Sequence, residues 1–142
     1  MKKRKQKKLY KGARPKGDKI VKQQKILISD DERDLVLMLK LRFEIEGFKV
    51  IEAYDGEETL SQVHKEKPDL ILLDGMMPKI NGFEVCRQIK EKNKQIPIIM
   101  FTAKGQEEDK EMGKRVGADD YVIKPFEFND LIMLIKKHLN VL

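Results

Sequence analysis

The stretch Leu70-Ile71-Leu72-Leu73-Asp74-Gly75-Met76-Met77-Pro78 decides how the rest of the chain is interpreted. Four aliphatic residues in a row are typical of a short strand that is buried on both faces. Asp74 follows them at once, and Gly75 and Pro78 end the regular structure. In open α/β sheets, sites form outside the carboxyl ends of the strands. Asp74 therefore either caps the next turn, a common position for Asp, or contributes a carboxylate to such a site.

The composition indicates an intracellular chain without disulfide bonds. A length of 142 residues suits one domain with an extra segment. The single Cys86 excludes an internal disulfide and gives no reason to expect an oxidising compartment. No apolar run is long enough to span a bilayer, and the basic start at 1–8 lacks the apolar stretch of a secretory signal. We expect a cytoplasmic protein with no membrane span.

The positive charge is concentrated at the beginning of the chain. Residues 1–25 carry twelve Lys or Arg against the single acid Asp18, a local charge of +11, so the +6 chain has −5 elsewhere. Residues 1–24 contain too few apolar side chains to offset the entropy of ordering. We therefore predict a flexible basic arm at 1–24 and a domain at 25–142.

Several roles for this arm are open. One is contact with a polyanion, which could be nucleic acid, a membrane surface or an acidic partner. Another is a solubilising tail or an extension added for expression. A third is that the arm folds back on the acidic domain. We favour the external polyanion, because charge runs near a terminus often serve as interaction arms.

Apolar runs and helical periods alternate along the domain and predict an α/β fold. Five such pairs in about 117 residues favour an open, doubly wound, five-stranded parallel sheet over a barrel, which needs eight pairs. Strands are predicted at 25–29, 48–53, 69–73, 96–101 and 120–123. Helices are predicted at 34–46, 56–65, from 82 onward, at 106–116 and at 128–139.

The helices carry recognisable ends and inward-facing stripes. Asp55 and Asn81 are predicted N-caps, each with Glu three residues later, and Gly47 is a predicted left-handed C-terminal cap. The first helix offers an inner stripe at Leu35, Met38, Leu39 and Phe43 and a second stripe at Leu37, Leu41 and Ile45. Further core candidates are Phe83, Cys86 or Val85, Ile89, Met112, Val116, Leu131, Ile132, Ile135 and Leu139.

Polar side chains follow four of the predicted strands. They are Asp30 and Asp31, Asp74, Thr102, and Lys124. Because the carboxyl ends of parallel strands share one edge, these groups should converge. Carboxylates are ligands that Mg²⁺ prefers, and an Asp carboxylate can attack phosphorus. A metal, a Lys and a hydroxyl can then neutralise the transferring phosphoryl group.

With these residues the chain resembles the receiver domain of two-component response regulators, over about residues 24–142. The matching pieces are Ile26-Leu27-Ile28-Ser29-Asp30-Asp31, Leu72-Leu73-Asp74-Gly75-Met76-Met77-Pro78 with Asn81-Gly82, Phe101-Thr102-Ala103, and Tyr121-Val122-Ile123-Lys124-Pro125-Phe126. The resemblance implies a flavodoxin-like (βα)5 fold with strand order 2-1-3-4-5.

The resemblance also implies roles and partners. It implies Asp74 as the phosphoacceptor; Asp30, Asp31, Asp74 and the main-chain carbonyl of Met76 as Mg²⁺ ligands; Thr102 and Lys124 as catalytic groups; Thr102 and Tyr121 as the switch; and a cis bond before Pro125. The donor would be a sensor histidine kinase or a phosphotransfer protein. The face of helix 4, strand 5 and helix 5 would then bind a downstream effector or form a homodimer. Such a module catalyses its own phosphorylation and dephosphorylation without being a conventional enzyme.

Three other functions compete with this one. A phosphatase with an aspartyl nucleophile would need a general acid and a cap over the site, but Met76 cannot donate a proton and no cap insertion is present. A nucleotide-binding fold would need a Gly-rich loop after the first strand, where acidic 29–31 would instead repel a pyrophosphate. The remaining alternative is a regulator that binds nucleic acid or another polyanion through residues 1–24.

Overall fold

Five parallel strands form one sheet in the computed structural model, which describes residues 22–103 and 107–141, except the side chains of 107–109. The strands are β2 (Lys25–Ser29), β3 (Lys49–Ala53), β4 (Leu70–Asp74), β5 (Ile98–Ala103) and β6 (Asp120–Lys124). Their order across the sheet is β3-β2-β4-β5-β6. Counted from β2 as the first strand of the sheet, this is the order 2-1-3-4-5, so the predicted fold is confirmed.

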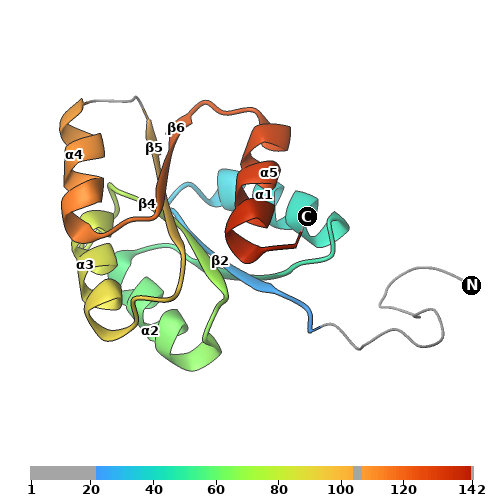
Figure 1. Ribbon diagram of the computed structural model, residues 1–142, viewed down its shortest axis with the longest axis horizontal. Coiled ribbons are helices and arrows are strands. Elements are labelled where there is room, and N and C mark those ends of the chain that lie inside the picture. Colours follow the sequence, from blue (N-terminus) through green and yellow to red (C-terminus); the bar gives the residue numbers. More distant parts are fainter. Residues whose placement is uncertain (1–21, 104–106, 142) are drawn as a thin grey trace, which may run out of the picture.

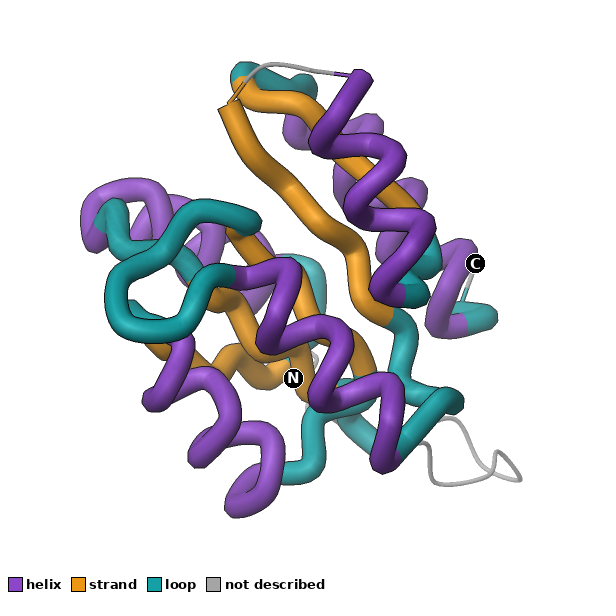
Figure 2. The backbone as a smooth tube through the Cα atoms, turned by 90° about the vertical axis from the view of Figure 1, so that its left-hand side faces the viewer, coloured by secondary structure: helices purple, strands orange, loops and turns teal. Residues whose placement is uncertain are grey.

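Helices cover both faces of this sheet. They are α1 (Arg33–Ile45), α2 (Gly56–Glu66), α3 (Gly82–Lys92), α4 (Glu107–Val116) and α5 (Phe128–Leu139). α1 and α5 lie on one face, and α2, α3 and α4 lie on the other (Figure 1). In Figure 2 the helices of the second face lie in front of the strands. Each of the first four strands is thus followed by a crossover helix, as parallel pairing requires, and α5 follows the last strand.

The central strand β4 is buried along its whole length because its side chains alternate between two helix-covered faces. Leu70 and Leu72 pack with α1 and α5, whereas Ile71 and Leu73 pack with α2 and α3. Each such side chain contributes about 1.5–3 kcal/mol when it is fully removed from water. A continuous apolar run, rather than an alternating one, is therefore what this position requires.

The inner face of α1 differs from the predicted one. Val36, Leu39 and Phe43 are its buried residues and Leu35 is partly buried, whereas Met38 is 45% exposed. The second predicted stripe, Leu37, Leu41 and Ile45, faces solvent. α1 carries apolar residues around most of its circumference, so periodicity alone does not tell which stripe meets the sheet.

Two smaller predictions also need correction. Met112 of α4 is exposed rather than in the core, and Gly113 is buried beside the ring of Tyr121. β5 begins at Ile98 and runs to Ala103, so Thr102 lies inside the strand and not after it. The other core candidates on α3 and α5 are buried or partly buried, and Val116 is partly buried.

The predicted helix caps are present. Asp55 Oδ1 accepts a hydrogen bond from Glu58 N at 2.8 Å, and Asn81 Oδ1 accepts one from Glu84 N at 3.0 Å. Gly47 has a φ of +99°, the left-handed conformation that ends α1. None of the helices in the described ranges combines the length and the apolar character needed to cross a membrane.

Candidate functional site

Three carboxylates meet at the carboxyl edge of the sheet. Asp30 and Asp31 follow β2, and Asp74 ends the neighbouring β4. One oxygen from each lies within 4.8 Å of the others, and Asp30 and Asp74 are buried. All three donors are carboxylate oxygens, the ligand type that suits Mg²⁺. The residues predicted from sequence are therefore together, and their chemistry fits a divalent cation.

Asp30 is held rigidly inside this cluster. Its N–H donates to Ala53 O at 3.1 Å, and its Oδ1 accepts from Glu32 N at 2.8 Å. Burial raises the pKa of Asp30 above its ordinary value, although the hydrogen bonds from Lys124 and Glu32 N oppose the rise. The orientation of this carboxylate is thus set by the backbone around it.

Lys124, from the end of β6, supplies the positive charge. Its Nζ lies 2.7 Å from Asp30 Oδ2, 3.1 Å from Glu32 Oε1 and 4.0 Å from Asp74 Oδ2. Burial alone would lower the pKa of Lys124, but the hydrogen bond to Asp30 and the charge of Asp74 outweigh it and the pKa is raised. Glu32 was not predicted as a partner of Lys124; its place in the acidic run after β2 is the signal that could have indicated it.

Asp74 is the most perturbed acid of the site. Burial, followed by the negative charge of Asp30, raises the pKa of Asp74 to about 7, while Lys124 opposes the shift. Its Oδ1 accepts a hydrogen bond from Met76 N at 3.2 Å. Perturbation of this kind is common at functional sites because burial and like charges are arranged around the reacting group.

The backbone around Asp74 packs tightly against α3. Gly82 N donates to Gly75 O at 2.8 Å. A Cβ on Gly82 would collide with the main-chain carbonyl oxygen of Asp74, so a glycine is needed at the start of α3. This close approach fixes where β4 ends and hence where the Asp74 carboxylate emerges.

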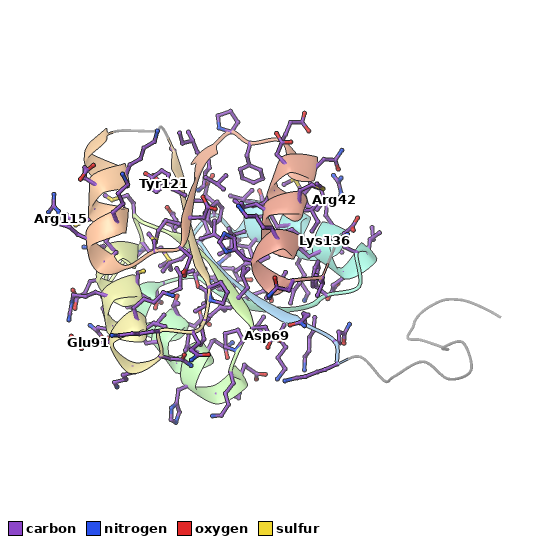
Figure 3. All side chains as sticks on the ribbon, viewed as in Figure 1. Arg42, Asp69, Glu91, Arg115, Tyr121 and Lys136 are labelled. Carbon is purple, nitrogen blue, oxygen red and sulfur yellow. The ribbon has the colours of Figure 1, made fainter. Side chains whose placement is uncertain are left out.

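Thr102 and Tyr121 lie on neighbouring strands, β5 and β6. The side chain of Thr102 is buried, and its Oγ1 donates to Ala103 O at 3.3 Å. Tyr121 pairs in register with Met100, two residues before Thr102, so alternation puts both side chains on the face covered by α4. Figure 3 shows Tyr121 between α4 and β6.

The remaining predicted positions border the site. Met76 is 68% exposed, and its main-chain N–H donates the hydrogen bond to Asp74 Oδ1. Metal binding by its main-chain carbonyl stays a prediction. The Lys124–Pro125 bond is cis, as predicted. The loop from Gly75 to Asn81 reaches α2, where Gly56 N donates to Pro78 O at 3.2 Å.

The sequence is similar to that of a known family. A model of the response regulator receiver domain matches residues 26–136. The alkaline phosphatase synthesis transcriptional regulatory protein PhoP of Bacillus subtilis is 47% identical over 112 residues, which are 79% of this chain and 47% of that protein. The chain thus spans about half the length of this curated relative.

Solved structures of response regulators are similar to this chain as well. A putative response regulator from Chloroflexus aurantiacus is 36% identical with a TM-score of 0.79, covering 84% of this chain and 99% of that one. The response regulator TrrA of Thermotoga maritima, solved in complex with Mg²⁺-BeF, is 36% identical with a TM-score of 0.76 and covers 82% and 99%.

Proposed function

Since this chain belongs to the family of response regulator receiver domains, which act in two-component signalling, we propose that Asp74 accepts a phosphoryl group from a phosphohistidine. The observation that carries the proposal is the meeting of three Asp carboxylates with Lys124 at the edge of the sheet where β5, with Thr102 as its second-last residue, also ends. A relative solved with Mg²⁺-BeF supports the same chemistry.

The transfer needs a nucleophile and compensation of negative charge. An oxygen of Asp74 attacks phosphorus, the new P–O bond forms as the P–N bond breaks, and the histidine nitrogen leaves with its electron pair. Lys124 and the Thr102 hydroxyl then interact with the phosphoryl oxygens. Lys124 would therefore have to exchange its present partner, Asp30, for a phosphoryl oxygen. In the structure its Nζ lies 2.7 Å from Asp30 Oδ2. Hydrolysis of the acyl phosphate by water returns Asp74 to its free form.

A divalent cation fits the same acids. Asp30, Asp31, Asp74 and the main-chain carbonyl of Met76 would hold Mg²⁺, which would neutralise charge on the phosphoryl oxygens when bound. Burial raises the pKa of both Asp30 and Asp74, and for Asp74 the charges of Asp30 and Asp31 add to the rise. Such a cluster is expected to gain most from a cation that all three carboxylates share.

The partners follow from this chemistry. A sensor histidine kinase or a phosphotransfer protein would supply the phosphohistidine, and a downstream effector would bind the face formed by α4, β6 and α5. Homodimerisation through that face is a further proposal. Tyr121 lies there beside Gly113, so a movement of Thr102 toward the phosphoryl group would be passed to this face through the shared side of β5 and β6.

We propose that the receiver unit covers 25–142 and that 1–24 form a separate basic arm. The match of the family model to residues 26–136 supports the start of the unit. A contact between the arm and an external polyanion stays a prediction, since residues 1–21 lie outside the described part of the chain. The comparisons do not favour polyanion binding as the main function.

Mass spectrometry after incubation with Mg²⁺ and a small acyl phosphate tests the phosphoacceptor. Wild type should gain one phosphoryl group that maps to Asp74, and chelation of Mg²⁺ should prevent the gain. Asp74→Asn should gain none, while the exposed control Asp130→Asn should behave like wild type. An undiminished adduct in Asp74→Asn would exclude this residue as the acceptor.

A further inference from the structure

The helix α1 presents an apolar face that nothing in the described part of the chain covers. Leu37, Met38, Leu41 and Ile45 are 53%, 45%, 54% and 80% exposed. They follow one another at helical spacing and form a stripe on the side opposite the sheet. Asp34 and Glu44 are exposed residues of the same turns. We call these six residues the α1 outer face.

The charged groups among the six residues of the α1 outer face are both acidic, and the basic residues of the helix make their contacts at its sides. The Arg33 guanidinium lies 3.9 Å from the ring centroid of Tyr54, and that of Arg42 lies 4.0 Å from the ring centroid of Phe128. Lys40 Nζ lies 3.8 Å from Glu52 Oε1. The face therefore combines apolar surface with acids, and its matching ligand is a basic segment with some apolar side chains.

The N-terminal segment enters the domain beside the end of α1. Gln23 Nε2 donates to Gly47 O at 3.1 Å, and Lys49 N donates to Gln24 O at 2.9 Å. Gly47 is two residues past Ile45 of the outer face. Figure 1 shows the start of β2 and the end of α1 on the same side of the molecule. Gln23 and Gln24 thus hold the start of the described chain close to one end of the apolar stripe.

The composition of 1–21 matches what the α1 outer face requires. This segment has ten Lys or Arg against Asp18, and Leu9, Tyr10, Ile20 and Val21 are its larger apolar residues. The thirteen positions between Leu9 and residue 22 can span about 43 Å when extended, whereas the stripe from Leu37 to Ile45 is about 12 Å long. The tether also gives the segment an effective concentration of about a millimolar at this face.

From these observations we infer that residues 1–21 bind the α1 outer face of the same chain, with Lys and Arg beside Asp34 and Glu44 and apolar side chains over Leu37, Leu41 and Ile45. This contact goes beyond the phosphoryl chemistry and does not depend on it. It also gives the acidic domain, rather than an external polyanion, as the first partner of the basic arm.

A spin label in the arm of the full chain tests the inference. Gly12→Cys is labelled with a nitroxide; the native Cys86 is buried with a pKa raised to about 12, so the introduced thiol is the one that reacts. Amide signals of 37–45 should lose intensity relative to the ascorbate-reduced sample. The loss should disappear in Leu41→Ser/Ile45→Ser and persist in the control Met133→Ser, an apolar residue of α5 that is 60% exposed.

Two further samples test whether something other than the same chain's residues 1–21 binds the α1 outer face. A mixture of nitroxide-labelled chain with unlabelled ¹⁵N chain reports contacts between copies, and a loss of intensity on α1 that occurs equally in that mixture would overturn the intramolecular contact. A uniform loss over all surfaces, or none on α1, would also overturn it. If the arm signals respond to added RNA while α1 shows no loss, the external polyanion is the correct partner.

Discussion

The Lys124 ammonium lies 2.7 Å from Asp30 Oδ2, and this ion pair joins the ends of β6 and β2 across the site. The side chain of Asp30 is fully buried and that of Lys124 is 14% exposed. Removing one partner of a buried pair leaves an uncompensated charge, which costs more than the pair itself contributes. Lys124 is therefore a structural residue of the metal-free domain as well as a proposed catalytic one.

Lys124→Met should lower the free energy of unfolding by about 3 kcal/mol in the absence of divalent cations, since Asp30 and Asp74 then face each other without a counter-charge. Denaturant unfolding in the presence of a chelator measures this. Lys136→Met is the matched control, because Lys136 pairs with Glu46 at 3.1 Å on the surface and should cost less than about 1 kcal/mol. An equal loss of unfolding free energy in the two variants would contradict a structural role of the Lys124–Asp30 pair.

Asp74→Asn should stabilise the metal-free domain by about 1–3 kcal/mol at pH 8, because it removes a buried charge next to Asp30 and Asp31. The pKa of Asp74 is raised from 3.8 to about 7 in the folded chain. The unfolded chain thus loses this proton first as pH rises, so the stability of wild type falls between about pH 4 and pH 7.

The stabilising effect of Asp74→Asn should accordingly be small at pH 4 and grow toward pH 8, and added Mg²⁺ should reduce it. Thermal unfolding with a chelator at several pH values gives the measurement. Asp31→Asn should act in the same direction, since Asp31 belongs to the same cluster. A lower melting temperature for both variants at pH 8 would count against a repulsive cluster.

Gly82→Ala should destabilise the domain and impair phosphoryl uptake, because the added Cβ collides with the carbonyl oxygen of Asp74 and must displace β4 or α3. Overpacking of this kind typically costs about 1–3 kcal/mol. Gly113→Ala is the opposite case. Its Cβ would lie 3.5 Å from the Tyr121 ring, an ordinary contact, and Ala is favoured over Gly in a helix by about 0.5–1 kcal/mol.

Chemical denaturation of both glycine variants distinguishes the two positions. Gly113→Ala should leave uptake at Asp74 intact while raising stability. If Gly82→Ala were as stable as wild type, the tight approach of α3 to the end of β4 would not be what positions Asp74.

Thr102→Ala should weaken the response of α4 to a phosphoryl analogue. The buried Thr102 hydroxyl donates to Ala103 O at 3.3 Å, a long bond that a phosphoryl oxygen can replace. With Mg²⁺ and beryllofluoride, amide shifts at 110–116 and at Tyr121 should be large in wild type and reduced in Thr102→Ala. Ser61→Ala, an exposed hydroxyl on α2, is the control. If the amide shifts were as large in Thr102→Ala as in wild type, Thr102 would not couple the site to α4.

The strands and the acids of the site could be predicted from the chain alone. The run from Leu70 to Leu73 has no polar position, so it needs cover on both faces, and Asp74 must emerge where that cover ends. The same reasoning applied to Asp30 and Lys124 places them at the same edge. Residue type and position after a buried run are local properties, and they are enough to predict which groups share the site.

The partners of those groups depend on tertiary structure. Lys124 pairs more closely with Asp30 than with Asp74, and this depends on how side chains from strands distant in sequence are oriented at the sheet edge. Glu32 also contacts Lys124, because the turn into α1 brings it there. The face of α1 is a similar case. Val36 and Met38 are both apolar, and their spacing does not distinguish them.

What decided between Val36 and Met38 is how α1 crosses the sheet. Val36, Leu39 and Phe43 belong to one buried cluster with Ile26 and Ile28 of β2, and the ring centroids of Phe43 and Phe128, at the start of α5, are 5.6 Å apart. The sequence determined that α1 is a helix with more apolar residues than one face can bury. Only the packing of α1 and α5 on the sheet decided which of them remain at the surface, because that choice is made by the neighbours and not by the helix itself.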